Sequence, residues 1–437
     1  MKILVHVRPY SKRFFLDAAA LAFGDSAQIV TFSEFRKCGD RWEGAFTGSP
    51  TWDVSLPVHV MEDVIARDRY LRSISRENAE RIVRRFWAGM EQMFDAEHFD
   101  FVLLHPVDCH VQDICERVAR SHEVPCMSFV GSFLGGYGKL TLRGEAVDVR
   151  DTVDPSEVDA VLSKLCAKNF LPDSEKEHVK SSARDVARYY WRRKLIENIY
   201  NPILRAATRD WDNQQYGTLL VGKRHFSDLY CSDYDQLFSR ISDIDIGDNA
   251  AYLPLHYVPE QTTDYFCKNI AAPGYERYIF SIVDQSAGKT QFLVKEHPAM
   301  FGKRSLSFYE RLRDRENVRI IHPLDSSLQL LEDVGTVLVD NGTVGVESLI
   351  RGKRVIAFED SYYSGLHPNL HRVEAYSDDL LDIPLVDGYS NEVFVRDLLK
   401  QLFPSDFVAD KHMNRCDPVP VAFALKNYFF QTGAIDG

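Results

Sequence analysis

Residues 336–348, TVLVDNGTVGVES, decide the fold of this chain. An apolar, β-branched run of strand length ends at Asp340, a turn with two glycines follows, and helical spacing begins near Val344. A second buried run, Arg354–Phe358, comes directly after that helix. When a helix connects two successive strands, the two strands lie parallel in one sheet. This order therefore predicts a doubly wound α/β sheet.

The same alternation continues upstream. Three more apolar runs have strand length, and segments with helical spacing at 305–313 and 326–332 accompany them. These runs are 250–255, 291–295 and 318–321. The first part of the chain repeats the pattern, with helices expected at 14–23 and 111–122. Its expected strands are 2–7, 28–32, 100–104 and 125–130, with a glycine-rich turn at 131–138. We therefore expect an α/β protein with two Rossmann-like, doubly wound sheets.

The length of 437 residues corresponds to two or three domains. We place an N-terminal Rossmann-like domain at 1–160 and a C-terminal Rossmann-like domain at 218–390. Between them, 161–217 has a helical apolar period without a convincing strand, which is typical of a connector or insert. Residues 391–437 are expected to form C-terminal helices that can return to the N-terminal domain.

Composition excludes several classes of protein. Lys and Arg number 52 against 64 Asp and Glu, so the net charge of -12 gives no overall field for nucleic acid, and none is expected as a partner. The eight cysteines form no C-x-x-C pair, which argues against a zinc ribbon and favours a reducing cytoplasm. The sequence has neither a leader-like N-terminus nor a membrane-spanning run, so membrane contact is expected to be peripheral.

Polar residues follow all five strands expected in the second half of the chain. Open α/β sheets bind ligands outside the carboxyl ends of their strands, so these loops predict a site. The loops are 256–260, which includes His256 and Glu260, and 296–298, 322–326, 341–348 and 359–363.

The loop at Asn341–Gly345 suits a phosphate group. Glycines let backbone N–H groups approach an anion, Thr343 adds a hydroxyl, and the helix that begins near Val344 points its positive end at the same place. Glu347, one turn into the helix, can accept two ribose hydroxyls. An ordinary strand-to-helix turn, with a glutamate that complements the helix dipole, would show the same residues.

Two His-Pro dipeptides follow neighbouring strands, at His297 and His322. An imidazole at His297 can donate a hydrogen bond to a diphosphate or a leaving phosphate, and a loop histidine with purely local contacts is the alternative. We expect one of the two to be structural. No metal site is expected, because the D-x-D pairs near 235 and 245 and the histidines at 367 and 371 have unsuitable surroundings.

Three stretches resemble bacterial capsule and surface-polysaccharide glycosyltransferases, the group that includes the Kdo transferases of capsule assembly and, more distantly, sialyl- and polysialyltransferases. They are 254–260 (PLHYVPE), 294–298 (VKEHP) and 339–356. The resemblance implies a GT-B fold, two Rossmann-like domains facing across a cleft, with the nucleotide sugar on the C-terminal domain and the acceptor on the N-terminal one. It also implies that His297, Gly342 and Thr343 contact phosphate and that Glu347 binds the ribose.

A base that deprotonates an acceptor hydroxyl is expected in the loop after the strand at 100–104. Asp108, His110 and Asp113 are the candidates there. We rank Asp108 first, because Asp113 falls in the first turn of the following helix, where complementing the helix dipole is an alternative role.

We therefore expect a metal-independent, cofactor-free glycosyltransferase that adds an acidic sugar, such as Kdo or sialic acid, from a CMP donor to a surface glycan or its lipid-linked primer. Metal independence follows because a CMP-sugar has one phosphate to neutralise. The alternatives are a transferase that uses a nucleoside diphosphate donor, including the CDP-glycerol type, and a non-catalytic polysaccharide assembly subunit.

Basic and aromatic residues interleave at Arg184–Lys194, where Arg184, Arg188 and Arg192 share one helix face. Such a helix can hold a net-acidic protein to the anionic inner face of a membrane. A solvent-exposed face packed by its aromatic residues is the alternative.

Overall fold

The structure is a computed structural model of the 437-residue chain, and two compact units compose it. The residues that it describes are 1–24, 26–35, 38–42, 54–167, 170, 235–268, 274–286, 288–300, 304–406 and 413–432, with isolated positions at 191, 199, 203, 206 and 207. Within these ranges the first unit contains 1–152 and 400–432, and the second contains 153–167 and 235–399.

The first unit is built on a five-stranded parallel sheet of order β3-β2-β1-β4-β5. Its strands are β1 (Lys2–His6), β2 (Gln28–Ser33), β3 (Arg41–Trp42), β4 (Phe101–Leu103) and β5 (Cys126–Met127). The central strand β1 is buried on both faces, which explains its continuous apolar run. Along the chain, β2 and β3 are added on one side of β1, and β4 and β5 are then added on the other side. The sheet is therefore doubly wound.

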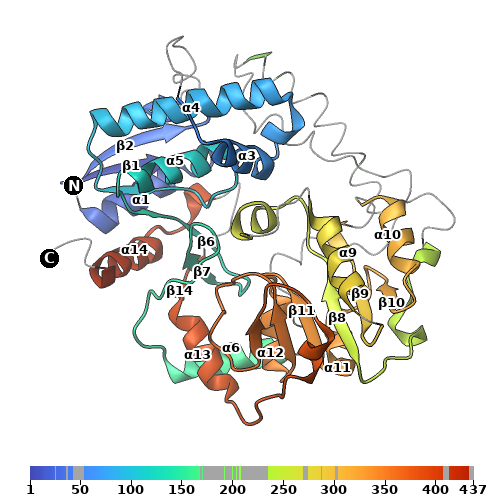
Figure 1. Ribbon diagram of the computed structural model, residues 1–437. Helices are drawn as coiled ribbons and strands as arrows, with labels where there is room; N and C mark the ends of the chain where they lie inside the picture. Colours follow the sequence, from blue (N-terminus) through green and yellow to red (C-terminus); the bar gives the residue numbers. More distant parts are fainter. Residues whose placement is uncertain are drawn as a thin grey trace. The chain divides into compact units, whose positions relative to one another are not determined.

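Helices cover both faces of this sheet (Figure 1). On one side lie α1 (Lys12–Phe23) and α14 (Val419–Thr432), and on the other α3 (Val58–Arg67), α4 (Arg76–Ala96) and α5 (His110–Ser121). Ile3 and Val5 of β1 form one core with Phe15 of α1 and Leu425 of α14. The C-terminal helix therefore completes the hydrophobic core of the N-terminal sheet.

A small antiparallel sheet, β14-β7-β6, accompanies the first unit. Its strands are β6 (Phe129–Gly131), β7 (Tyr137–Leu140) and β14 (Leu402–Pro404). The strand expected at 125–130 is thus divided between β5 and β6, and the glycine-rich segment after it leads into β7. Gly138 is required there, because a Cβ would lie 2.7 Å from the ring of Phe403.

The second unit contains a six-stranded parallel sheet of order β10-β9-β8-β11-β12-β13. Its strands are β8 (Ala250–Pro254), β9 (Gln291–Lys295), β10 (Val318–Ile321), β11 (Thr336–Val339), β12 (Arg354–Ala357) and β13 (Leu370–Arg372). The first five lie within one residue of the predicted runs. Counted within this sheet, the order is 3-2-1-4-5-6, that of dinucleotide-binding Rossmann domains.

The helices of this sheet are α9 (Tyr275–Gln285), α10 (Leu306–Arg313), α11 (Ser327–Asp333) and α12 (Val344–Ile350). Ile279 of α9 and Phe308 of α10 share a core with Leu253 and Val294. From the opposite face, Tyr252 donates a 3.2 Å hydrogen bond to Ser327 of α11. Both faces are therefore covered, as the apolar runs predict.

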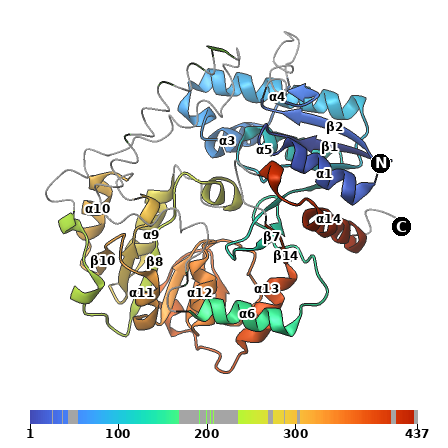
Figure 2. The same cartoon turned by 180° about the vertical axis from the view of Figure 1, so that it is seen from behind.

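Two further helices, α6 (Pro155–Cys166) and α13 (Asn391–Lys400), lie beside α12 in the same unit (Figure 2). Arg351 donates to the Leu165 carbonyl at 3.3 Å, and Asn391 donates to the Ile350 carbonyl at 2.8 Å. The start of the expected connector is thus part of the second sheet's packing. The basic segment Arg184–Lys194, apart from Trp191, and most of the connector lie outside the described residues.

The two sheets confirm the predicted α/β class with two Rossmann-like, doubly wound units. In the part of the chain that the structure describes, no helix has the length and apolar character needed to cross a bilayer.

Candidate functional site

The switch point of the second sheet lies between β8 and β11, where the strand order reverses. The chain leaves β8 toward β9 on one side and leaves β11 toward β12 on the other, so the loops after these two strands diverge. They begin at Leu255 and Asp340. Ligands of open α/β sheets bind in such a crevice, and the sequence places polar residues there.

His256 and Asp340 meet in this crevice. The Nε2 atom of His256 lies 3.4 Å from Oδ2 of Asp340, and the hydroxyl of Tyr278 donates to Oδ1 of Asp340 at 2.7 Å. Burial raises the pKa of Asp340, while His256 and the Tyr278 hydroxyl act in the opposite direction. The His256 side chain keeps 12% of its surface exposed, so the imidazole is oriented by a buried carboxylate and still reaches the crevice.

The two glycines of the loop have different environments. A Cβ on Gly342 would stand 3.3 Å from Cε1 of His256, so this glycine leaves room for the ring. A Cβ on Gly345 would overlap the hydroxyl of Tyr363, which donates to the Gly342 carbonyl at 2.7 Å. Gly345 therefore serves the packing of a tyrosine, and only Gly342 borders the crevice.

Asn341 and Thr343 have polar atoms to offer a ligand. The Asn341 amide donates to the Thr262 carbonyl at 3.2 Å and to Cys267 Sγ at 3.5 Å, whereas its buried Oδ1 accepts no hydrogen bond from any described residue. Thr343 precedes α12 without a side-chain capping bond. Glu347 lies inside α12 and is 4% exposed, and its contact with a ribose stays a prediction.

A buried ion pair fastens the loops after β8 and β9 to each other. Arg304 donates to Glu296 Oε2 at 2.6 Å and to the His256 carbonyl at 2.6 Å. Glu296 also accepts from the His297 backbone N–H at 2.7 Å. Burial lowers the pKa of Arg304, but Glu296, Tyr275 and Tyr309 together outweigh this effect, so the pKa lies above its ordinary value. His256 and His297 thereby share one edge, and the rings of Tyr257 and His297 lie 5.8 Å apart.

Two of the predicted loop residues have local roles. Nδ1 of His322 accepts from the Leu324 N–H at 3.2 Å, which holds this ring within its own turn. The carboxylate of Glu260 accepts from the Thr262 hydroxyl at 2.8 Å at the start of a helical turn, Thr262–Phe266. The choice of His297 over His322 as the ligand-facing histidine stays a prediction.

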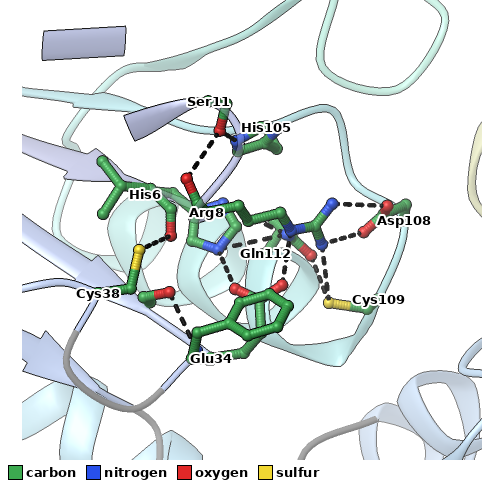
Figure 3. Close-up of polar contacts among 12 residues, drawn as sticks. His6, Arg8, Ser11, Glu34, Cys38, His105, Asp108, Cys109 and Gln112 are labelled. Carbon is green, nitrogen blue, oxygen red and sulfur yellow. Dashed lines mark hydrogen bonds and ion pairs between the residues drawn. The ribbon is translucent and has the colours of Figure 1, made fainter. Parts of the chain in front are cut away.

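The first unit has a polar cluster at its own switch point, between β1 and β4 (Figure 3). Arg8 follows β1, and its Nε donates to Glu34 at 2.6 Å. Its two terminal nitrogens donate to the two oxygens of Asp108 at 3.0 and 2.8 Å. A single guanidinium therefore joins the loops after three strands.

Exposure increases along this cluster from its base to its rim. The side chain of Glu34 is 0% exposed, that of Arg8 is 4% exposed, and that of Asp108 is 30% exposed. His6 pairs with Glu34 at 2.8 Å. Burial alone would raise the pKa of Glu34, but Arg8 and His6 hold it at about 2. Asp108 is thus the carboxylate that a ligand can reach.

His105 and Ser11 border the same cluster. Ser11 Oγ and His105 Nε2 lie 2.8 Å apart, and the His105 ring stacks on Phe15 with centroids 4.2 Å apart. Burial, with the positive charge of Arg8, lowers the pKa of His105 well below its ordinary value. This imidazole is therefore neutral at physiological pH.

The other two N-terminal candidates are buried. The backbone N–H of His110 donates to Asp68 at 2.6 Å, and its Nδ1 lies 3.0 Å from the same carboxylate. Asp113 pairs with Arg117 at 2.8 Å and with Arg143. Both side chains are 0% exposed and take part in packing α5, which leaves Asp108 as the candidate at the surface.

Sequence reasoning missed His6, Arg8 and Glu34. Each lies at or just beyond the carboxyl end of β1 or β2, so the rule that located the second crevice would also have located this one. Their mutual pairing has no sequence signal, since 26 residues separate Arg8 from Glu34 and 100 separate it from Asp108.

No protein-family model and no curated protein matches this sequence. Among solved structures, the chain is similar to the β-Kdo 2,7 transferase of KpsC from Thermosulfurimonas dismutans, with 11% identity over 98% of this chain and 99% of that one and a TM-score of 0.37. The β-Kdo 2,4 transferase of the same KpsC shows 13% identity over 68% and 79%, with a TM-score of 0.32. A UDP-GlcNAc 2-epimerase from Methanocaldococcus jannaschii shows 11% identity over 99% of both chains, with a TM-score of 0.24. At these scores the likenesses assign neither a family nor an activity to the chain.

Proposed function

We propose that this protein is a glycosyltransferase of bacterial surface-polysaccharide synthesis that binds a nucleotide sugar at the β8/β11 crevice. The observation that carries the proposal is the His256 ring, oriented by buried Asp340 and seated against Gly342 at the switch point of a Rossmann-type sheet. Two Rossmann-like units in one chain are also what a GT-B transferase requires.

The proposed role of the second unit is to hold and stabilise the departing nucleotide. A phosphate gains negative charge as the bond to the sugar breaks, so fixed donors that face it accelerate the reaction. His256 and His297 are the donors that we propose, and the Arg304–Glu296 pair holds their loops together. Thr343 adds a hydroxyl at the start of α12.

The proposed role of the first unit is to bind the acceptor and activate its hydroxyl. Asp108 is positioned by Arg8 and remains partly exposed. A carboxylate has about four lone-pair sites, so the two bonds from Arg8 leave sites for an acceptor hydroxyl. Asp108 is accordingly the proposed base, and the acceptor is a glycan or a lipid-linked glycan.

For the donor, we propose a CMP-linked acidic sugar such as Kdo or sialic acid, transferred without a metal ion. Two histidines and a polar loop are sufficient donors for a single phosphate. Full activity in excess EDTA is expected, and a strict requirement for Mg²⁺ or Mn²⁺ would overturn this part. We place the enzyme in the cytoplasm, with Arg184–Lys194 as the proposed contact to the inner face of the membrane.

Thermal unfolding with CMP, CDP, UDP and GDP tests the proposal. A nucleotide present at 100 times its Kd stabilises the protein by about 2.7 kcal/mol, and CMP should give the largest effect. A preference for UDP or GDP would favour a nucleoside diphosphate donor, and a preference for CDP a CDP-glycerol-type reaction. Retained glycan binding without any nucleotide effect would indicate a non-catalytic assembly subunit.

A further inference from the structure

Glu34 is a fully buried carboxylate directly after β2, at the carboxyl end of the N-terminal sheet, where it contacts His6 and Arg8. Removing charges from water costs several kcal/mol per ion, and well-packed apolar residues of similar volume often stabilise a protein as much as a buried ion pair does. A contribution to stability is therefore a weak explanation for a carboxylate at this position. The geometry of its contacts with Arg8 is a stronger explanation.

The guanidinium of Arg8 is planar, and its donors form a rigid fork. One edge of the fork, at Nε, is held by Glu34 at 2.6 Å, while Nη1 and Nη2 donate to Asp108. Fixing Nε fixes the plane of the fork, and the two parallel bonds then fix the plane of the Asp108 carboxylate (Figure 3). Glu34 and Asp108 thus hold the same guanidinium from two sides.

We propose that Glu34 is a positioning residue for Asp108: through Arg8 it aims the remaining lone pairs of that carboxylate at the acceptor hydroxyl. This inference rests on the proposed function. His6, which is 0% exposed and 2.8 Å from the second oxygen of Glu34, holds the glutamate in turn. The chain of contacts runs from the carboxyl end of β1 to the rim of the crevice.

The test compares Glu34→Gln with Glu34→Asp. The glutamine keeps the shape but loses the charge that fixes Arg8, whereas the aspartate keeps the charge at a shorter reach. Misplacing a reacting group by about 1 Å can cost roughly 10²-fold in rate. We expect Glu34→Gln to lower kcat by about 10- to 100-fold, to leave the Kd for CMP unchanged, and Glu34→Asp to recover part of the loss.

Glu97→Gln is the matched control. Glu97 pairs with Lys2 at 2.7 Å and with Arg41 at 3.3 Å in the same unit. Lys2 is the first residue of β1, so this pair lies at the end of the strand opposite to Arg8. Glu97→Gln should therefore retain the wild-type kcat. An equal loss of kcat in Glu97→Gln, or an unchanged kcat in Glu34→Gln, would overturn the positioning role, as would a weaker Kd for CMP.

A crystal structure of Glu34→Gln separates this inference from the proposed function. If the wild-type protein transfers no sugar from CMP-, UDP- or GDP-linked donors, the proposed function fails. The positioning role still predicts that Arg8 loses at least one of its two bonds to Asp108 in that crystal. An unchanged Arg8–Asp108 pair would refute the inference whatever the enzyme does.

Discussion

Gly342 lies so close to His256 that a Cβ would stand 3.3 Å from Cε1 of the imidazole. The first prediction concerns this contact. Gly342→Ala should displace the ring from its place beside Asp340 and weaken CMP binding by about tenfold, or 1.4 kcal/mol. Gly335→Ala is the control, because nothing lies within 4 Å of its added Cβ. Isothermal titration that finds equal Kd values for both variants would remove Gly342 from the site.

Asp108 and Asp113 should respond differently to the loss of charge. Asp108→Asn should lower kcat by at least about 100-fold, as expected when a general base is removed, with little change in unfolding free energy because the side chain is 30% exposed. Asp113→Asn should destabilise the protein instead, since Arg117 and Arg143 lose a buried partner. Initial rates and urea unfolding of both variants decide the point, and the reverse pattern would make Asp113 the base.

His297→Ala should reduce kcat/KM by roughly 10²- to 10³-fold, the usual loss when one donor to a developing anion is removed. His322→Ala should do much less, because its ring accepts a hydrogen bond from its own turn. Far-ultraviolet circular dichroism serves to show that both variants are folded. A larger loss at His322 would mean that the other His-Pro loop faces the nucleotide.

Two ion pairs of the second unit have the same 2.6 Å separation and very different exposure. Arg304 and Glu296 are 4% and 0% exposed, while Arg315 and Asp284 are 24% and 54% exposed. Glu296→Gln should therefore cost about 3–5 kcal/mol, because it leaves a buried guanidinium without its counter-ion. Asp284→Asn should cost less than about 1 kcal/mol. Chemical denaturation measures both, and similar values would show that Arg304 gains other partners.

The pairing of Glu34 predicts that the stability of the folded protein decreases in acid. Its pKa falls from an ordinary 4.5 to about 2 in the folded protein, because Arg8 and His6 outweigh the effect of burial. A depressed folded pKa contributes stability that is complete above about pH 5 and disappears as the pH falls toward 2, here about 3 kcal/mol. Unfolding free energy should depend less steeply on pH in this window for Glu34→Gln than for the wild type. Parallel profiles would contradict the assigned pKa.

Much of the fold could be predicted because the strands of the second sheet are buried on both faces. β9 and β12 appear in the sequence as continuous apolar runs bounded by polar loops. β13 and β14 could not be predicted, since each has three residues and draws its stability from pairing with a distant strand. The long helix α4 shows helical apolar spacing, with Ile82, Phe86 and Met90 buried, and could have been predicted.

The site was less predictable than the fold for a related reason. Positions after strands identify one end of the sheet, and this rule selected His256, His297 and Asn341 as candidates. It does not show which polar side chains pair with one another. The ribose role of Glu347 rests on its place one turn into a helix and stays a prediction. Its low exposure depends on what packs against that turn, and a local sequence pattern does not contain this information.

The packing of α14 on the N-terminal sheet has a consequence for the order of synthesis. Val421, Leu425 and Phe429 join the core formed by Ile3 and Val5, and β14 pairs with β7. Domains generally fold as units while the chain emerges from the ribosome, the N-terminal one first. Here every described strand of the second sheet emerges before α14 does. The unit translated second can therefore mature first, while the unit translated first waits with part of its core exposed to chaperones.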